Sequence, residues 1–147
     1  MQTPRIVVLV GLPGSGKSTY LDRLGVTALS SDAVRGLLAD DVTDQSIHRE
    51  VFATVRYLLR RRLALARPVT YLDATHLTLR DRRPYIKMGR LYDCSVEAIF
   101  FDVPLEVCRE RNRSRARVVP DDVLDRMAAK LVPPSVEEGF SAVTVQR

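Results

Sequence analysis

The sequence of 147 residues has no tryptophan and only two cysteines, Cys94 and Cys108. Two cysteines without metal-site spacing exclude a disulfide framework, and a reducing compartment is expected. Long apolar runs are also missing. No stretch approaches the roughly 20 apolar residues that span a bilayer, and the apolar run near the start is too short for a signal peptide. We therefore expect a cytoplasmic protein without a membrane-spanning segment.

Lysine is scarce as well, occurring only at Lys17, Lys87 and Lys130, so that arginine supplies nearly all of the basic charge. The formal net charge is +5, which attracts polyanions such as nucleic acid, nucleotides or acidic membrane surfaces. A genomic preference for arginine codons explains the arginine bias equally well. Repeats and low-complexity tracts are absent, and the length fits a single domain over residues 1–147.

Apolar runs alternate with helical patterns along the chain. Strands are predicted at 6–10, 26–29, 69–73, 96–101 and 140–145. Helices are predicted at about 17–24, 32–38, 44–66, from 78 onward, 105–112 and from 120 onward. Pro84 should kink or delay the fourth of these helices. The alternation predicts an α/β fold with a five-stranded, mostly parallel sheet that carries helices on both faces.

The most specific motif is the glycine-rich segment that follows the first predicted strand. It fits the pattern of glycine, four residues, glycine, lysine and serine or threonine. Glycines let backbone amides curl around an oxyanion, and the next helix points its N-terminal amides at the phosphates. Lys17 would reach the β- and γ-phosphates, and the Ser18 hydroxyl would ligate Mg²⁺. The alternative is a glycine-rich turn without a ligand. The predicted ATP site comprises Gly11, Leu12, Pro13, Gly14, Ser15, Gly16, Lys17, Ser18 and Thr19.

Acidic residues lie at or just after the ends of three predicted strands, at the edge where a parallel sheet binds ligands. Asp32 can accept the proton of an attacking hydroxyl, and Arg35, one helical turn later, offers a guanidinium to a phosphate. Alternatively, Asp32 only caps its helix and Arg35 is solvated. Asp73 is a candidate magnesium ligand, directly or through water. For Asp102, a helix cap before Pro104 is favoured over a catalytic role.

Two arginine clusters are candidates for binding anions. Arg113, Arg115 and Arg117 alternate in an irregular segment, at about 112–120, which is either an Arg-rich lid or a charged helix end. The long third helix carries a basic stripe, for which an exposed helix face is favoured over a nucleic-acid track. The stripe consists of Arg49, Arg56, Arg60 and Arg67.

Four motifs follow one another at spacings that resemble the kinase module of the polynucleotide 5′-hydroxyl kinases, the phage and bacterial end-healing enzymes. They are the glycine-rich segment, the Asp32/Arg35 pair, Leu72-Asp-Ala-Thr-His76 and the arginine segment that ends at Pro120. The resemblance covers residues from about 5 to 130. It implies a P-loop NTPase fold and transfer of the ATP γ-phosphate to a 5′-OH end of DNA or RNA.

The same resemblance implies a role for each matching residue. Asp32 would be the general base, Arg35 would hold the acceptor phosphate, and Arg115, with Arg113 beside it, would contact the donor phosphates. His76 departs from the pattern, because relatives more often carry asparagine there, and packing or local hydrogen bonding is favoured over catalysis. The relatives also fuse this module to phosphatase or ligase domains, which do not occur in these 147 residues.

Two other functions fit the same motifs. A small-molecule kinase acting on a sugar, nucleoside or antibiotic would keep the phosphate loop and Asp32 but would not need a basic track. A non-catalytic nucleotide-binding module would bind ATP without turnover.

Overall fold

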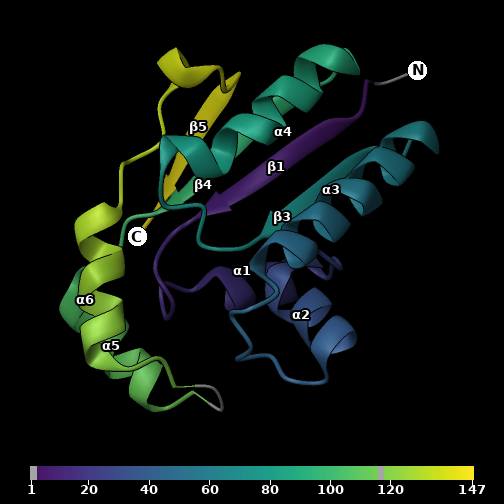
Figure 1. Ribbon diagram of the computed structural model, residues 1–147. Coiled ribbons are helices and arrows are strands. Elements are labelled where there is room, and N and C mark those ends of the chain that lie inside the picture. Colours follow the sequence, from purple (N-terminus) through teal and green to yellow (C-terminus); the bar gives the residue numbers. More distant parts are fainter. Residues whose placement is uncertain (1–2, 116–117) are drawn as a thin grey trace.

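Five strands form one sheet in the order β2-β3-β1-β4-β5, and every described strand pair is parallel (Figure 1). The computed structural model describes residues 3–115 and 118–147. The strands are β1 (Arg5–Val10), β2 (Leu29–Ser30), β3 (Val69–Asp73), β4 (Ser95–Phe101) and β5 (Ala142–Gln146). The central strand β1 lies between β3 and β4, starting with Arg5 opposite Val69 and Ser95. The carboxyl ends of all five strands therefore lie at one edge of the sheet.

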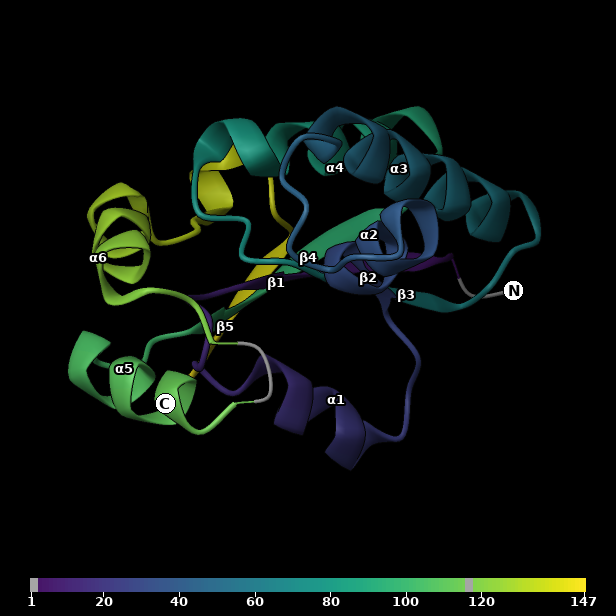
Figure 2. The same ribbon diagram turned by 60° about the horizontal axis from the view of Figure 1, so that its bottom comes forward.

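Helices cover both faces of this sheet, as the sequence predicts. Figure 2 shows α3 and α4 on one face and α1 on the other, with α5 and α6 beside the carboxyl edge. The helices are α1 (Lys17–Leu24), α2 (Ser31–Ala39), α3 (His48–Ala64), α4 (Leu79–Leu91), α5 (Leu105–Arg113) and α6 (Asp121–Lys130), with a 3₁₀ turn η1 (Val136–Glu138). None of the helices in the described ranges is long and apolar enough to cross a membrane.

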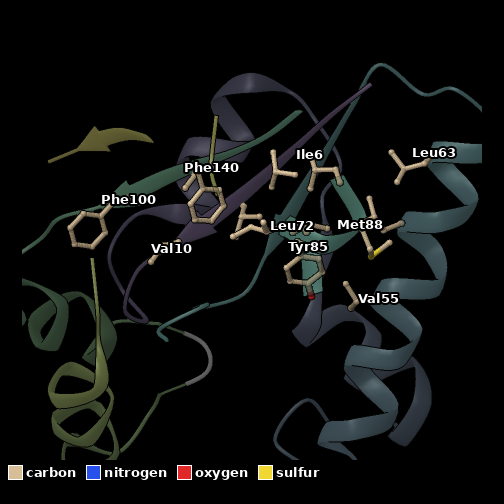
Figure 3. Close-up of a cluster of buried hydrophobic side chains, with 14 of the residues drawn as sticks. Ile6, Val10, Val55, Leu63, Leu72, Tyr85, Met88, Phe100 and Phe140 are labelled. Carbon is tan, nitrogen blue, oxygen red and sulfur yellow. The ribbon is translucent and has the colours of Figure 1, made fainter. Parts of the chain in front are cut away.

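Strand β1 divides the core, because successive side chains of a strand point to opposite faces. Ile6, Val8 and Val10 pack with residues of α3 and α4, including Val55 and Tyr85 (Figure 3). Val7 and Leu9 pack on the other face, in a cluster that includes Leu21 of α1. A third cluster contains Leu12, Leu77, Cys108 and Leu124, and it joins the loop after β1 to α5 and α6.

The boundaries of some elements differ from the prediction for local reasons. The second strand contains only Leu29 and Ser30, at the edge of the sheet. The third helix begins at His48 rather than at residue 44, because the Asp44 carboxylate accepts hydrogen bonds from the amide (2.9 Å) and hydroxyl (2.6 Å) of Ser46. Such bonds favour a turn over a helix.

Pro84 does not delay helix α4, which starts at Leu79. A capping box fixes that start, because the Thr78 hydroxyl accepts from the Asp81 amide and the Asp81 carboxylate accepts from the Thr78 amide, both at 3.2 Å. The helix then continues through Pro84 to Leu91. The carbonyl that loses its partner at Pro84 is that of Arg80, an exposed residue, where water can replace the missing bond.

Candidate functional site

The turn between β1 and α1 has a backbone that only glycine adopts easily. Gly14 has φ 82° and Gly16, the N-cap of α1, has φ 102°, both in the left-handed region. A Cβ at Gly14 would lie 2.7 Å from the carbonyl oxygen of Cys108 in α5. The loop thus packs closely against α5 at Gly14, where glycine is required by space as well as by torsion angle, whereas Gly16 is required by its torsion angle alone.

Lys17 lies inside this loop. Its Nζ donates hydrogen bonds to the carbonyl oxygens of Gly11 (2.8 Å) and Leu12 (2.9 Å), and the residue is buried. Burial lowers the pKa of Lys17 to about 8, against the opposing charge of Asp73, and the nearby Arg115 lowers it further. Two cations share this space, so a phosphate would find complementary charge here.

One cavity of about 680 Å³ brings together most residues that the sequence singles out separately. Its lining includes 13–19, Asp32, Arg35, Asp73 and Arg115. Gly11 and Leu12 do not line it. Their carbonyls bind Lys17, and the Leu12 side chain packs into the cluster that joins the loop to α5 and α6.

The Asp32/Arg35 pair does not follow the alternative of a capping aspartate and a solvated arginine. Ser30 caps α2, since its hydroxyl accepts from the Ala33 amide at 3.2 Å. The Arg35 side chain is only 5% exposed, and its Nη1 lies 3.2 Å from Oδ1 of Asp32, whose side chain is 43% exposed. The arginine is therefore a buried group of the cavity, and the carboxylate is accessible from it.

Asp73 ends β3 and lines the cavity together with Ser18. Burial raises the pKa of Asp73; Lys17 opposes this shift, and the charge of Asp32 adds to it. No group of three or more His, Cys, Asp or Glu side chains that could hold a metal occurs in the described part of the chain. Magnesium commonly uses one or two carboxylates together with phosphate oxygens and water. A hydroxyl and a carboxylate therefore fit a magnesium ion that enters with a nucleotide.

Three buried side-chain atoms lack a hydrogen-bond partner among the described residues: Ser15 Oγ, Arg35 Nε and Arg115 Nη1. All three residues line the same cavity. A buried polar group without a partner costs about 1–3 kcal/mol, so such groups are normally satisfied. Each of these atoms can donate a hydrogen bond, and their concentration in one cavity indicates a ligand rich in acceptor oxygens.

The arginine segment contributes Arg115 but not Arg113. Arg113 belongs to α5, is exposed and lies 3.2 Å from the carboxylate of Asp121, outside the cavity lining. Arg117 falls outside the described residues. Asn112, which the sequence analysis missed, is completely buried; its side chain donates to the Val119 carbonyl (2.6 Å) and accepts from the Val119 amide (3.0 Å). Asn112 thus ties the end of α5 to the approach to α6.

The expected local role of His76 is confirmed. Its Nδ1 lies 2.6 Å from the Leu9 carbonyl oxygen, and its ring makes an edge contact with Tyr85 at 5.5 Å. Burial lowers the pKa of His76 to about 4. The expected helix cap at Asp102 is wrong: Pro104 is the N-cap of α5, without a side-chain cap, and the Asp102 carboxylate lies 3.6 Å from Nε of Arg147.

The basic stripe of α3 lies away from the cavity, in agreement with an exposed helix face. Arg49, Arg60 and Arg67 are exposed, and none of the stripe residues lines the cavity. His48 and Phe52 of the same helix do line it, and sequence analysis missed both. Their spacing of four residues marks a shared helix face, but only the tertiary structure shows what that face meets.

Known proteins resemble the chain in both sequence and fold. A family model described as an AAA domain matches residues 6–134. A bifunctional polynucleotide phosphatase/kinase of Schizosaccharomyces pombe is 24% identical over 143 residues, covering 94% of this chain and 32% of that protein. An L-seryl-tRNA(Sec) kinase of Methanococcus maripaludis is 23% identical over 139 residues, covering 90% of this chain and 54% of that protein. The chain thus spans about a third to a half of the length of these two relatives.

Among solved structures, a chain of the Pnkp1/Rnl/Hen1 RNA repair complex superposes with a TM-score of 0.74 at 20% identity, covering 89% of this chain and 45% of that chain. At this identity the superposition shows a shared fold. Together with the family match, it confirms the P-loop fold that the sequence predicts.

Proposed function

The chain belongs to the AAA domain family, and from that premise we propose that it is a P-loop kinase that transfers the ATP γ-phosphate to a 5′-hydroxyl end of DNA or RNA. The observation that carries the proposal is the set of buried donors without a partner, on Ser15, Arg35 and Arg115, around a cavity that also contains Lys17. A polyphosphate supplies the acceptor oxygens that these donors lack.

The cysteine content supports a cytoplasmic location, since Cys94 and Cys108 are both free thiols.

The proposed reaction is an in-line phosphoryl transfer. The acceptor oxygen forms a bond to the γ-phosphorus, the bond from that phosphorus to the β–γ bridging oxygen breaks, and ADP leaves. Asp32 takes the proton of the acceptor hydroxyl. Lys17 and Arg115 stabilise the negative charge on the transferring group, so most of the rate enhancement comes from positioning and electrostatics. Ser18 and Asp73 would hold Mg²⁺, which neutralises phosphate charge when bound.

Arg35 supports a phosphate-bearing acceptor. A buried guanidinium with an unpaired donor destabilises the protein if the site binds only a neutral sugar. The same guanidinium suits an acceptor that carries an anion beside the reacting hydroxyl. The resemblance to a polynucleotide phosphatase/kinase agrees with this assignment. The resemblance to a seryl-tRNA kinase favours a second candidate, a kinase for another alcohol, which would share Asp32 and the phosphate loop.

An acceptor panel tests the assignment. Labelled ATP is incubated with 5′-OH DNA and RNA oligonucleotides, nucleosides, seryl-tRNA, sugars and other small alcohols, and the labelled product is measured. We expect transfer to the oligonucleotide ends. Transfer to small alcohols or to seryl-tRNA in preference to the ends would replace the proposed acceptor, and ATP binding without any transfer would favour a non-catalytic module.

Replacing Asp32 separates chemistry from binding. Asp32→Ala should lower turnover by at least about 10² while ATP affinity stays near wild type, because the base acts on the acceptor. Asp102→Ala removes an exposed carboxylate that follows β4, outside the lining of the cavity, and is the matched control. Equal turnover in the wild type and in Asp32→Ala would remove Asp32 as the base.

A further inference from the structure

The cavity has an aromatic side that the proposed phosphate chemistry does not use. His48 and Phe52 line it, together with Asp32 and Arg35 of α2. Helix α2 packs against α3, as Figures 1 and 2 both show, so the first turns of α3 lie beside the proposed acceptor residues. The chain has no tryptophan and few aromatic residues, which makes two aromatic side chains at this place informative.

The two rings form a pair with one fixed and one accessible member. They are four residues apart on one helix face, with ring centroids separated by 4.7 Å and planes tilted by 46°. Phe52 is partly buried and packs against the main core, whereas His48 is exposed. The core therefore anchors Phe52, and His48 can present a ring to a molecule in the cavity.

We propose that His48 and Phe52 stack against the base of the terminal acceptor nucleotide, so that the acceptor must carry a planar aromatic ring beside its reacting hydroxyl. This inference rests on the proposed function, whose acceptor class it narrows. Three features of the cavity then match three parts of one ligand: Asp32 takes the hydroxyl, Arg35 the adjacent phosphate and the aromatic pair the base. Stacking tolerates all bases, because every base has a π-face.

An acceptor without a base tests the inference directly. One oligonucleotide carries an ordinary 5′-terminal nucleoside, and the other carries a tetrahydrofuran abasic unit with the same 5′-OH and the same following phosphate. The stacking energy of one base corresponds to a loss of about tenfold in kcat/KM for the abasic acceptor with the wild-type enzyme. This comparison needs no variant and thus no assumption about folding.

Variants assign that loss to the aromatic pair. His48→Ala should lower kcat/KM about tenfold for the base-bearing acceptor and leave the abasic acceptor unchanged. His48→Phe should restore the preference for a base. Phe52→Leu keeps an apolar side chain against the core and should reduce the preference for the base as well. Tyr57→Ala removes an exposed ring from the same helix, outside the cavity lining, and is the matched control.

The outcomes distinguish the two proposals. Equal kcat/KM of the wild type on both oligonucleotides, or an equal loss on both in His48→Ala, overturns the stacking role and leaves the kinase assignment intact. Absence of transfer to either oligonucleotide overturns the proposed function, and the stacking role with it. A preference for the base that disappears in His48→Ala and returns in His48→Phe supports the inference.

Discussion

Two arginines, Arg82 and Arg35, are almost completely buried, but they differ in how completely the protein pairs their donors. Nε and Nη2 of Arg82 each lie 2.9 Å from a carboxylate oxygen of Glu138, and its Nη1 donates to the carbonyls of His76 (3.0 Å), Leu77 (3.3 Å) and Val132 (2.9 Å). Arg35 has an ion pair with the half-exposed Asp32, and its Nε has no hydrogen-bond partner in the described residues.

The difference distinguishes an arginine that stabilises the fold from one for which we propose a binding role. Arg82 joins α4 to the segment after β3 and to η1, and the protein itself supplies all of the acceptors that it needs. Arg35 lines the cavity and keeps a hydrogen-bond donor that a bound ligand can use. A buried charge is costly, so an arginine that folding leaves incompletely paired is better explained by binding than by stability.

The largest expected effect is a loss of stability on replacement of Arg82. Arg82→Met should lower the free energy of unfolding by about 3–5 kcal/mol, because Glu138 and three carbonyls lose their partner. Arg35→Met should cost less than about 1 kcal/mol, since an apolar side chain of similar size replaces an incompletely paired charge and Asp32 remains in contact with water. Urea unfolding followed by circular dichroism measures both. Equal losses in the two variants would break the comparison.

The next effect concerns the other incompletely paired arginine. ATP and Mg²⁺ at about 100 times the dissociation constant should stabilise the wild type by about 2.7 kcal/mol. Arg115→Ala should keep the stability of the unliganded protein but lose most of this gain at the same ligand concentration. Arg126→Ala, an exposed change on α6, serves as the control for thermal shift measurements. An unchanged ATP shift in Arg115→Ala would place its donor outside the nucleotide site.

A smaller effect is expected from pH. The pKa of Lys17 in the unliganded protein is about 8. Nucleotide affinity should therefore fall above pH 8, by up to about tenfold per pH unit, because binding requires the ammonium and takes up a proton. Calorimetric titrations in buffers with different ionisation enthalpies measure this uptake. Lys17→Arg remains charged, so its nucleotide affinity should show no such dependence on pH. A wild-type affinity that stays the same between pH 7 and 9.5 would contradict the role of Lys17.

Stability changes with the opposite sign over the same range. The folded-state pKa of Lys17 lies below the ordinary lysine value of 10.5, so the unfolded chain binds more protons between pH 8 and 10.5. The contribution of Lys17 to stability is complete above pH 10.5 and is lost as the pH falls through 8. Relative to Lys17→Met, the unliganded wild type should therefore gain stability as the pH rises through this window, while its nucleotide affinity falls.

Local sequence signals identify the parts of the fold and site that depend on short segments. The apolar run of β1 and the glycine spacing after it predict a buried strand and a phosphate loop, and positive φ angles occur at Gly14 and Gly16. The position of Asp32 after a strand also suffices to place it at the carboxyl edge of a parallel sheet. These inferences need only strand periodicity, turn chemistry and one rule of sheet geometry.

The groups that sequence analysis missed depend on distant partners. Arg82 forms an ion pair with Glu138, 56 residues later in the sequence, and the sequence around either residue does not indicate its partner. In the sequence, Asn112 looks like any polar residue near a helix end. Only the structure shows that its side-chain amide forms two hydrogen bonds with the backbone of Val119. For Asp102, position alone predicts a helix cap, but Pro104 is the N-cap of α5. For Arg82 and Asn112, the role depends on tertiary contacts that the local sequence does not indicate.

The central position of β1 has a consequence for how the protein is made. Arg5 pairs with Val69 on one side and with Ser95 on the other, so β1, which precedes both partner strands in the chain, cannot complete its ladders until β4 has left the ribosome. Pairing over such separations makes folding slow, since the intervening chain must be ordered before the contacts form. The glycine-rich loop that follows β1 thus leaves the ribosome before β3 and β4 do, and it gains rigid support only after both of these strands have paired with β1.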